Sequence, residues 1–416
     1  MHVELITIGD ELLLGLTIDT NAAYLARTLS AAGIEVVRRT TVGDDAAAIT
    51  AAVREAIART GAVITTGGLG PTSDDMTKPA VAELFGRGMQ RDEEVLRAIE
   101  RRFHALGHTM PPVNVQQAMI PEGARVLRNH HGTAPGIWLE DEQGRWVVML
   151  PGVPREMRGM TDDIVVPLLR ERIGAHPAVI ISRTLRTTGI GESALAELLG
   201  DDAREVEGLA VASLPGWEGT DLRITARGLS HERARVLLDA GATRLYARAG
   251  RYIYGEDGTD LAAVVLERCR KRGLQIATAE SCTGGLLGAR LTAISGSSDV
   301  YLGGVIAYAN SVKERWLGVR PADIQTHGAV SEVVARGMAA GICERMESGI
   351  GVGITGVAGP GGGTPEKPVG TVWIAVQVNG AIQARCRVYP GDRREIRLRS
   401  TQAALDMIRR ALSDAA

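Results

Sequence analysis

Residues 277–285 read A-T-A-E-S-C-T-G-G, and they follow an apolar, β-branched run that begins at Leu274. Apolar residues then recur at helical spacing from Leu286 to Ile294. This order predicts a strand, a tight turn and a helix, with hydroxyls and glycines where the chain leaves the strand. The N–H groups and partial positive charge at a helix start bind phosphates and developing oxyanions.

The hydroxyls of this turn have two interpretations. Ser281 is a candidate nucleophile if a base lies nearby. Alternatively, Ser281 or Thr283 caps the following helix. The nine residues alone favour the cap, so the decision depends on the rest of the C-terminal third.

Three further segments of that third are rich in polar groups at predicted strand or helix ends. Residues 303–313 read G-G-V-I-A-Y-A-N-S-V-K, a strand that ends in polar residues. Residues 351–371 begin as a strand and open into a long Gly/Pro loop, which permits close backbone approach to a ligand but lacks P-loop spacing. Residues 389–399 read Y-P-G-D-R-R-E-I-R-L-R, which predicts a turn followed by a basic helix. The alternative to a binding role is that these charges form a solvated helix face. Ligands of α/β proteins bind beyond the carboxyl ends of strands.

These segments resemble the nicotinamide mononucleotide deamidase domain that ends the competence/damage-inducible CinA proteins. The motifs H-G-A-V-S-E, G-I-T-G-V-A-G-P, P-E-K-P-V-G-T-V and P-G-D-R extend the match over the C-terminal domain, residues 255–416. The resemblance implies hydrolysis of the ring carboxamide of nicotinamide mononucleotide to nicotinate mononucleotide and ammonia. It also implies a serine nucleophile assisted by lysine and tyrosine, with no metal or other cofactor.

Carried over by motif, Ser281 is the nucleophile, and Tyr308 and Lys313 are its activating partners. Lys313 can accept the serine proton only if burial lowers its pKa well below ~10.4. Tyr308 would relay the proton or donate to the oxyanion. The resemblance also implies a set of substrate-binding residues: Thr283, Gly284, Thr355, Gly356 and Arg393.

Three points of chemistry accompany this assignment. The backbone N–H groups of residues 282–284 are the natural oxyanion donors. The planar guanidinium of Arg393 can bind a phosphate through two parallel hydrogen bonds. Cys282 is a rival nucleophile, because a thiol needs less activation than a hydroxyl; we favour a buried structural role for it.

Composition narrows the class of protein. A chain of 416 residues should form two to four domains, and 45% apolar with 3% aromatic content predicts cores of aliphatic residues. A net charge of −2, without basic-aromatic interleaving, does not indicate direct nucleic-acid binding. The four cysteines contain no C-x-x-C pair. Without a signal peptide or a run of ~20 apolar residues, we expect a cytoplasmic enzyme without membrane contact.

The N-terminal part alternates strands and helices. Repeated β-α units predict a doubly wound parallel sheet. The predicted strands are residues 3–8, 35–41, 62–66 and 146–150, and the predicted helices are residues 20–33, 46–59 and 78–85.

Residues 67–75, G-G-L-G-P-T-S-D-D, carry the main signal in this half. Glycines allow close backbone approach, while Asp74 and Asp75 can bind a hard divalent cation. Asp10 and Glu11 form a second acidic pair at a strand end. Together they suit metal-bridged pyrophosphate chemistry. The alternative is an N-cap role for Asp74 or Asp75, and we expect one of the two to have it.

I-G-D-E-L-L-L-G, T-T-G-G-L-G-P-T-S-D-D, G-T-A-P-G (residues 132–136) and L-P-G-V-P-R-E-M resemble the molybdopterin-binding-like domain that opens CinA proteins. The resemblance implies divalent-metal-dependent ADP-ribose pyrophosphatase activity. The same fold occurs in molybdenum cofactor biosynthesis, and fold does not decide function; the P-G-V-P-R-E-M segment favours ADP-ribose. We assign Asp10, Asp74 and Asp75 to the metal, Mg²⁺ or similar, and expect Lys78 to neutralise part of the site. The substrate-binding glycines are Gly67, Gly68 and Gly70.

Between the two halves lies a small α/β module in the position where CinA proteins have a KH-like domain. We predict strands at 184–187 and 222–227, helices at 191–199 and 231–247, and a linker at 256–260. Gly-x-x-Gly loops grip nucleic acid in KH domains, whereas Gly189-Ile190-Gly191 here has neither that spacing nor a flanking basic residue, so we interpret the module as a spacer or dimerisation element. The predicted domains are residues 1–170, 171–254 and 255–416.

Two classes of function follow from this reading. The first is a homodimeric, bifunctional enzyme acting on nicotinamide mononucleotide and ADP-ribose. The second is a scaffold or binding protein linked to DNA uptake or repair, with molybdopterin binding as a further alternative. Near-neutral charge argues against direct nucleic-acid binding.

Overall fold

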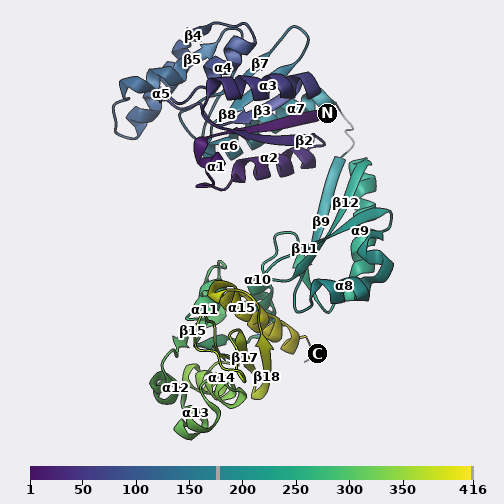
Figure 1. Ribbon diagram of the computed structural model, residues 1–416, viewed down its shortest axis with the longest axis vertical. Coiled ribbons are helices and arrows are strands. Elements are labelled where there is room, and N and C mark those ends of the chain that lie inside the picture. The colour runs from purple at the N-terminus through teal and green to yellow at the C-terminus, as the bar shows by residue number, and fades with distance from the viewer. Residues whose placement is uncertain (175–178, 414–416) are drawn as a thin grey trace. The chain divides into compact units, whose positions relative to one another are not determined.

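The computed structural model describes residues 1–174 and 179–413 (Figure 1). The chain forms two compact units, Met1–Ile181 with Ala226–Val236, and Ser182–Thr225 with Leu237–Ala416. Within the described residues, every helix is too short or too polar to cross a membrane.

A six-stranded mixed sheet forms the centre of the N-terminal domain. In spatial order its strands are β2 (Glu35–Val42), β1 (His2–Ile8), β3 (Ala62–Thr66), β8 (Trp146–Leu150), β7 (Gly136–Glu140) and β6 (Arg125–Leu127). The first four run parallel, as predicted. β7 pairs antiparallel with β8, β6 pairs antiparallel with β7, and neither of these two strands was predicted. Residues 141–145 are too few for the crossover that a parallel neighbour of β8 would require.

Helices cover both faces of this sheet, which makes it doubly wound. Strand β1 alternates between them: Leu5 packs in the cluster of Leu25 on α2, and Ile6 in the cluster of Ile49 on α3. Figure 1 shows α2 and α3 on opposite sides of the strands. The remaining elements are α1 (Asp10–Leu13), α2 (Thr20–Ala31), α3 (Ala46–Thr60), α4 (Thr77–Leu84), β4 (Met89–Arg91), α5 (Glu93–Ala105), β5 (Met119–Pro121), α6 (Pro154–Met160) and α7 (Val166–Ile173).

The middle module has a five-stranded sheet in the order β10-β11-β12-β9-β13. The β11–β12 hairpin was not predicted, because small and polar residues interrupt the apolar alternation of β11. Its elements are β9 (Val179–Thr187), α8 (Glu192–Leu199), β10 (Glu205–Val206), β11 (Leu209–Pro215), β12 (Thr220–Leu229), α9 (His231–Ala249) and β13 (Ile253–Glu256).

The C-terminal domain has a sheet in the order β15-β14-β16-β17-β18. Its strands are β14 (Ile276–Glu280), β15 (Tyr301–Ile306), β16 (Ile350–Gly356), β17 (Thr371–Val378) and β18 (Ala381–Val388). Both β15 and β16 pair with β14 in parallel, so the three carboxyl ends meet at one edge of the sheet. The predicted polar segments that follow these strands are thereby brought together.

Helices also cover both faces of the C-terminal sheet. They are α10 (Leu261–Arg272), α11 (Leu286–Thr292), α12 (Asn310–Leu317), α13 (Pro321–His327), α14 (Glu332–Met346) and α15 (Arg393–Ala411). Helix α14 packs directly on β16, where a Cβ added to Gly353 would lie 2.3 Å from the carbonyl oxygen of Ala335. Glycine is required at this contact because the two backbones touch.

Candidate functional site

Ser281 is the first residue after the central strand β14. Its N–H donates to the carbonyl of Ile354 at 2.9 Å, and the residue is 8% exposed. Gly285, with φ of 89°, occupies the N-cap of α11, and no side-chain cap bond is made there. The interpretation of Ser281 or Thr283 as the helix cap is therefore wrong, and the Ser281 hydroxyl is free for another role.

The carboxylate of Glu280 takes the place of that cap. Its two oxygens accept hydrogen bonds from the N–H groups of Gly285, Leu287 and Gly288 at 2.9–3.1 Å. Glu280 is 1% exposed, and the helix N-terminus stabilises its buried negative charge. Glu280 was not among the predicted site residues, although an acidic side chain at the end of a buried strand was the available signal.

A hydrogen bond within the turn limits which N–H groups can serve as oxyanion donors. The predicted donor on Gly284 bonds to the carbonyl of Ser281 at 3.1 Å. The N–H groups of Cys282 and Thr283 make no hydrogen bond to another residue in the described part of the chain. These two, rather than all three predicted donors, are available to a developing oxyanion.

Lys313 lies on α12 and is 1% exposed. Its Nζ donates to the carbonyls of Ala307 at 2.8 Å and Tyr308 at 3.2 Å. Burial lowers the pKa of Lys313, and the opposing influence comes from Cys282, next to Ser281. Lys313 is therefore buried, and burial acts on its pKa in the direction that a base role requires. Across the described residues no hydrogen bond joins Lys313 to Ser281, and its role as the base stays a prediction.

Tyr308 and Arg393 meet at the edge of the same site. Tyr308 is 62% exposed, and its hydroxyl accepts a hydrogen bond from Arg393 at 3.2 Å. Arg393 also donates to the carbonyl of Gly359 at 2.8 Å, within the Gly/Pro loop. These contacts hold the guanidinium beside the tyrosine, and Tyr308 makes no hydrogen bond to Ser281 in the residues described.

Of the other predicted substrate contacts, Thr283 and Thr355 are buried, Gly356 is half-buried and Gly284 is exposed. Thr355 is 1% exposed and donates to the carbonyl of Ala329 at 2.8 Å, while Gly356 ends β16. The hydroxyl of Thr283 is buried and unpaired among the described residues. Arg397, missed in the sequence, donates to the Thr283 carbonyl at 2.7 Å and thereby fixes the turn that carries Ser281.

In the N-terminal domain, the predicted Gly-rich turn lines a cavity of about 460 Å³. Gly67 has φ of 114°, and a Cβ there would lie 2.1 Å from the carbonyl oxygen of Ile8, so this turn lies directly against β1. The acidic residues that line the cavity are Glu11, Asp44, Asp74, Asp75 and Glu156.

The predicted metal-binding carboxylates have separate surroundings. Asp75 accepts hydrogen bonds from the N–H of Gly70 at 2.7 Å and from the N–H and hydroxyl of Thr72 at 2.8 and 2.6 Å, so it stabilises the loop. Asp10 accepts from the N–H of Asp44 at 3.2 Å and does not line the cavity. A hydrogen bond from Thr72 lowers the pKa of the exposed Asp74.

Helix α4 starts differently from the prediction. Met76 occupies its N-cap without a side-chain bond, so the N-cap role expected for one of Asp74 and Asp75 is wrong. Lys78 is 3% exposed, and its Nζ donates to the carbonyls of Gln116 and Gln117 at 2.7 and 3.2 Å. Burial lowers the pKa of Lys78 to about 8.

A preassembled metal site is absent from the described chain, where no group of three or more His, Cys, Asp or Glu side chains could hold a metal ion. Asp10, Asp74 and Asp75 therefore do not fit a three-carboxylate site. Mg²⁺, however, usually binds through one or two carboxylates plus substrate phosphates and water. Asp74 is the predicted ligand whose surroundings suit that mode.

Comparison with known proteins places the chain among proteins that combine three domains. The matching family descriptions are a probable molybdopterin binding domain over residues 4–171, a damage-inducible protein CinA KH domain over 182–255, and a CinA C-terminal domain over 258–412. The CinA-like protein of Gemmatimonas aurantiaca is 61% identical over 414 residues, 99% of this chain and 97% of that protein. The chain belongs to the CinA family.

Other relatives carry competence- or damage-inducible names as well. The putative competence-damage inducible protein of Moorella thermoacetica is 42% identical over 413 residues, 99% of each chain. Among solved structures, the competence/damage inducible protein CihA from Agrobacterium tumefaciens is 42% identical, covering 37% of this chain and 93% of that one with a TM-score of 0.36.

The four cysteines provide a direct test of the rival nucleophile. Cys282 is 6% exposed, and burial raises its pKa to about 12, whereas Cys386 is exposed. At pH 8 we expect one thiol to react rapidly with a disulfide reagent, and Cys386→Ser to remove that fast phase. A fast phase that survives Cys386→Ser but disappears in Cys282→Ala would identify Cys282 as an activated thiol.

Proposed function

We propose that this protein is a bifunctional hydrolase that recycles pyridine nucleotides. Its C-terminal domain would hydrolyse nicotinamide mononucleotide to nicotinate mononucleotide and ammonia. Its N-terminal domain would hydrolyse ADP-ribose to AMP and ribose 5-phosphate. The observation that carries the first activity is a buried lysine of lowered pKa whose amine interacts electrostatically with Cys282, the neighbour of a serine whose hydroxyl caps no helix. The family motifs support both.

In the deamidase reaction, neutral Lys313 accepts the Ser281 proton as Oγ attacks the carboxamide carbon. The N–H groups of Cys282 and Thr283 stabilise the oxyanion. The protonated lysine returns its proton to the nitrogen, ammonia leaves, and an acyl-serine ester remains. Water then cleaves that ester to give the nicotinate product and free Ser281. Arg393, held beside Tyr308, binds the phosphate.

In the second reaction, the Gly-rich turn brings backbone N–H groups to the pyrophosphate. A divalent ion bound with the substrate would neutralise phosphate charge and activate water, and Asp74 is the carboxylate proposed to hold it. Because Asp75 accepts three hydrogen bonds that stabilise the loop, we propose that it shapes the site.

Homodimerisation is a further proposal. Leu14, Leu16 and Ile18, which follow α1, are 72%, 78% and 84% exposed. A second copy of the chain would bury this apolar run, since exposed patches of this kind mark interfaces. The scaffold alternative predicts salt-dependent retention of DNA instead, which the net charge of −2 does not favour.

Ser281→Ala should lower the rate of ammonia release from nicotinamide mononucleotide by on the order of 10³-fold or more, because the nucleophile is lost. ADP-ribose hydrolysis and the melting temperature should stay unchanged. The matched variant Cys282→Ala should retain activity. The opposite pattern, with Ser281→Ala active and Cys282→Ala inactive, would assign the nucleophile to the cysteine.

Lys313→Arg should remove deamidase activity, because arginine stays protonated and cannot act as the base. In the unsubstituted protein, the neutral fraction of Lys313 increases as pH rises through its lowered pKa. We therefore expect kcat/KM to rise with pH and level off below the pKa of a free lysine. Lys271→Arg, on the exposed side of α10, is the control. An active Lys313→Arg enzyme with an unaltered pH profile would contradict a base role.

Chelation of divalent ions should stop ADP-ribose hydrolysis and leave the deamidase unaffected, since serine–lysine chemistry uses no metal. Both activities are measured on one sample during an EDTA titration, and added Mg²⁺ should restore the first. Equal loss of both activities, or ADP-ribose cleavage that resists chelation, would refute the assignment of two separate mechanisms.

A further inference from the structure

A cavity of about 500 Å³ lies within the compact unit formed by Ser182–Thr225 and Leu237–Ala416. Strand β18 and helix α15 of the C-terminal domain line one part of it, and residues 188–192 and 215–220 of the middle module line another. Its size is typical of a small-molecule site. No residue assigned above to either proposed reaction lines it.

The two loops of the middle module are held in place by the C-terminal domain. Gln402 on α15 donates to the hydroxyl of Thr188 at 3.3 Å. Gly189 follows with φ of 77°, a conformation that glycine adopts without strain. In the other loop, the guanidinium carbon of Arg290 on α11 lies 5.2 Å from the centre of the Trp217 ring. The cavity therefore has walls that are fixed by specific contacts.

Three arginines of the cavity have no partner. Arg385 and Arg387 lie two residues apart on β18, so their side chains share one face of the sheet. Arg399 lies on α15, which packs on that face. Across the described residues, none of these three side chains makes an ion pair or a hydrogen bond, and the Nε of Arg399 is buried as well. Three guanidinium groups with unused donors thus line one cavity.

The acidic side chains of the cavity do not neutralise these arginines. Glu218 forms an ion pair with Arg186. Asp406 pairs with Arg410, the fourth arginine of the cavity, at 2.7 Å. Glu192 is exposed in the first turn of α8, where the helix N-terminus stabilises its charge. The charge left unpaired at the cavity is therefore mainly positive.

Tyr389 adds a hydroxyl to the same lining. Its oxygen is buried and has no hydrogen-bond partner among the described residues. Burial raises the pKa of Tyr389 to about 12, although Arg387 and Arg399 act in the opposite direction. The hydroxyl therefore keeps its proton at neutral pH and can donate a hydrogen bond. Because buried polar atoms are normally paired, this one indicates an acceptor supplied by a ligand.

A purely protective role of the arginines does not explain this arrangement. Charged side chains on an edge strand such as β18 prevent pairing with another chain. That role accounts for Arg385 and Arg387. It does not account for Arg399, which lies on a helix, or for the buried hydroxyl of Tyr389.

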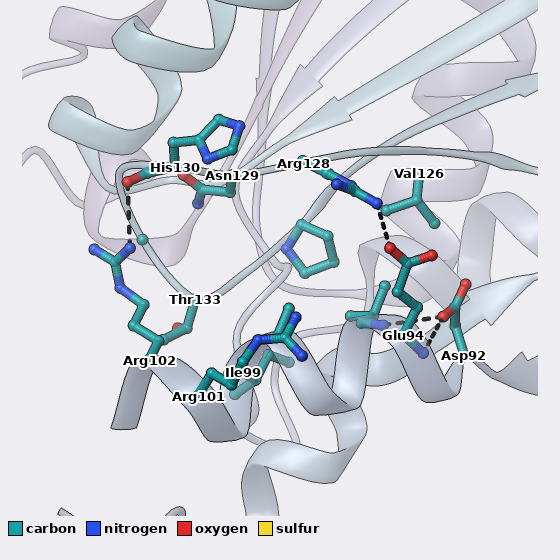
Figure 2. A pocket seen from close by; sticks show the side chains of 14 residues that line it. Asp92, Glu94, Ile99, Arg101, Arg102, Val126, Arg128, Asn129, His130 and Thr133 are labelled. Carbon is teal, nitrogen blue, oxygen red and sulfur yellow. Dashed lines mark hydrogen bonds and ion pairs between the residues drawn. The ribbon is translucent and has the colours of Figure 1, made fainter. Parts of the chain in front are cut away.

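A cavity of similar volume in the N-terminal domain provides a comparison. It lies between α5 and the loop that joins β6 to β7, and Figure 2 shows Arg128 paired there with Glu94. Arg102 donates to the carbonyl of His130 at 3.2 Å. Two of the three arginines at that cavity are thus engaged, whereas three of the four at the cavity beside β18 are not.

We propose that the cavity between β18 and α15 binds a small anion that carries two phosphoryl groups. A guanidinium binds phosphate oxygens through two parallel hydrogen bonds, and three guanidiniums match the charge of two adjacent phosphoryl groups better than that of one. The hydroxyl of Tyr389 donates a further hydrogen bond. Inorganic pyrophosphate and a nucleoside diphosphate share this chemistry. Ile190, Ile374 and Met407 also line the cavity and offer apolar contact to a nucleoside.

The test measures binding of inorganic pyrophosphate to the full-length chain by calorimetry, in EDTA so that the divalent ion proposed for the N-terminal site is removed. Arg385→Ala and Arg399→Ala should each weaken pyrophosphate binding about tenfold or more, because each removes a guanidinium. Arg272→Ala and Arg345→Ala change exposed arginines outside the cavity, and both controls should bind normally. Orthophosphate should bind the unsubstituted chain at least about tenfold more weakly than pyrophosphate.

Pyrophosphate should also raise the melting temperature of the unsubstituted chain and of both controls more than that of the two test variants. The proposal is wrong if pyrophosphate does not bind, or if orthophosphate binds equally well. Equal binding to test and control variants would place pyrophosphate elsewhere, for example at the Gly-rich turn, and would also contradict it. Should Arg399→Ala melt at a lower temperature without ligand, Arg385→Ala decides, because Arg385 is exposed.

Uridine diphosphate, titrated in the same way, distinguishes the two sources of the diphosphate group. Binding tighter than that of pyrophosphate, and weakened by Arg385→Ala, would identify a nucleoside diphosphate as the occupant. Weaker binding than that of pyrophosphate would identify the inorganic anion. Uridine diphosphate binding that is unaffected by Arg385→Ala, together with unaffected pyrophosphate binding, would overturn the site.

Discussion

The buried carboxylate of Glu280, bonded to three N–H groups of α11, is the interaction on which the C-terminal site depends. It supplies the cap that the turn hydroxyls would otherwise provide. A carboxylate this deeply buried is tolerated because the helix N-terminus offers both hydrogen bonds and positive potential. As a consequence, the Ser281 hydroxyl is not needed to cap α11 and is available for chemistry.

The parallel pairing of β14 with β15 and β16 gives that turn its neighbours. Because the carboxyl ends coincide, α12 begins close to the residue that follows β14. Lys313 is then buried by the same packing that aligns the strands. Its two carbonyl acceptors fix the amine, and no carboxylate among the described residues pairs with it, so desolvation lowers its pKa. Burial is thus what makes the lysine suitable as a base.

The N-terminal site follows a different principle. Its Gly-rich turn is closed by Asp75, whose carboxylate accepts three hydrogen bonds from within the loop. Asp74 also lines the cavity, and it is exposed. Two adjacent aspartates with the same intrinsic chemistry therefore have different surroundings, set by the local backbone.

The sequence by itself determined the alternating elements, the family motifs and most candidate residues. Strand and turn periodicity identified residues 62–66 and 146–150 without error, because local patterns of buried strands are strong. Tertiary structure decided what local pattern cannot encode: the role of Glu280, the separate surroundings of Asp10 and Asp75, and the cavity between β18 and α15. The physical reason is that a polar group's role depends on which partners satisfy it after burial. Those partners come from residues distant in the chain.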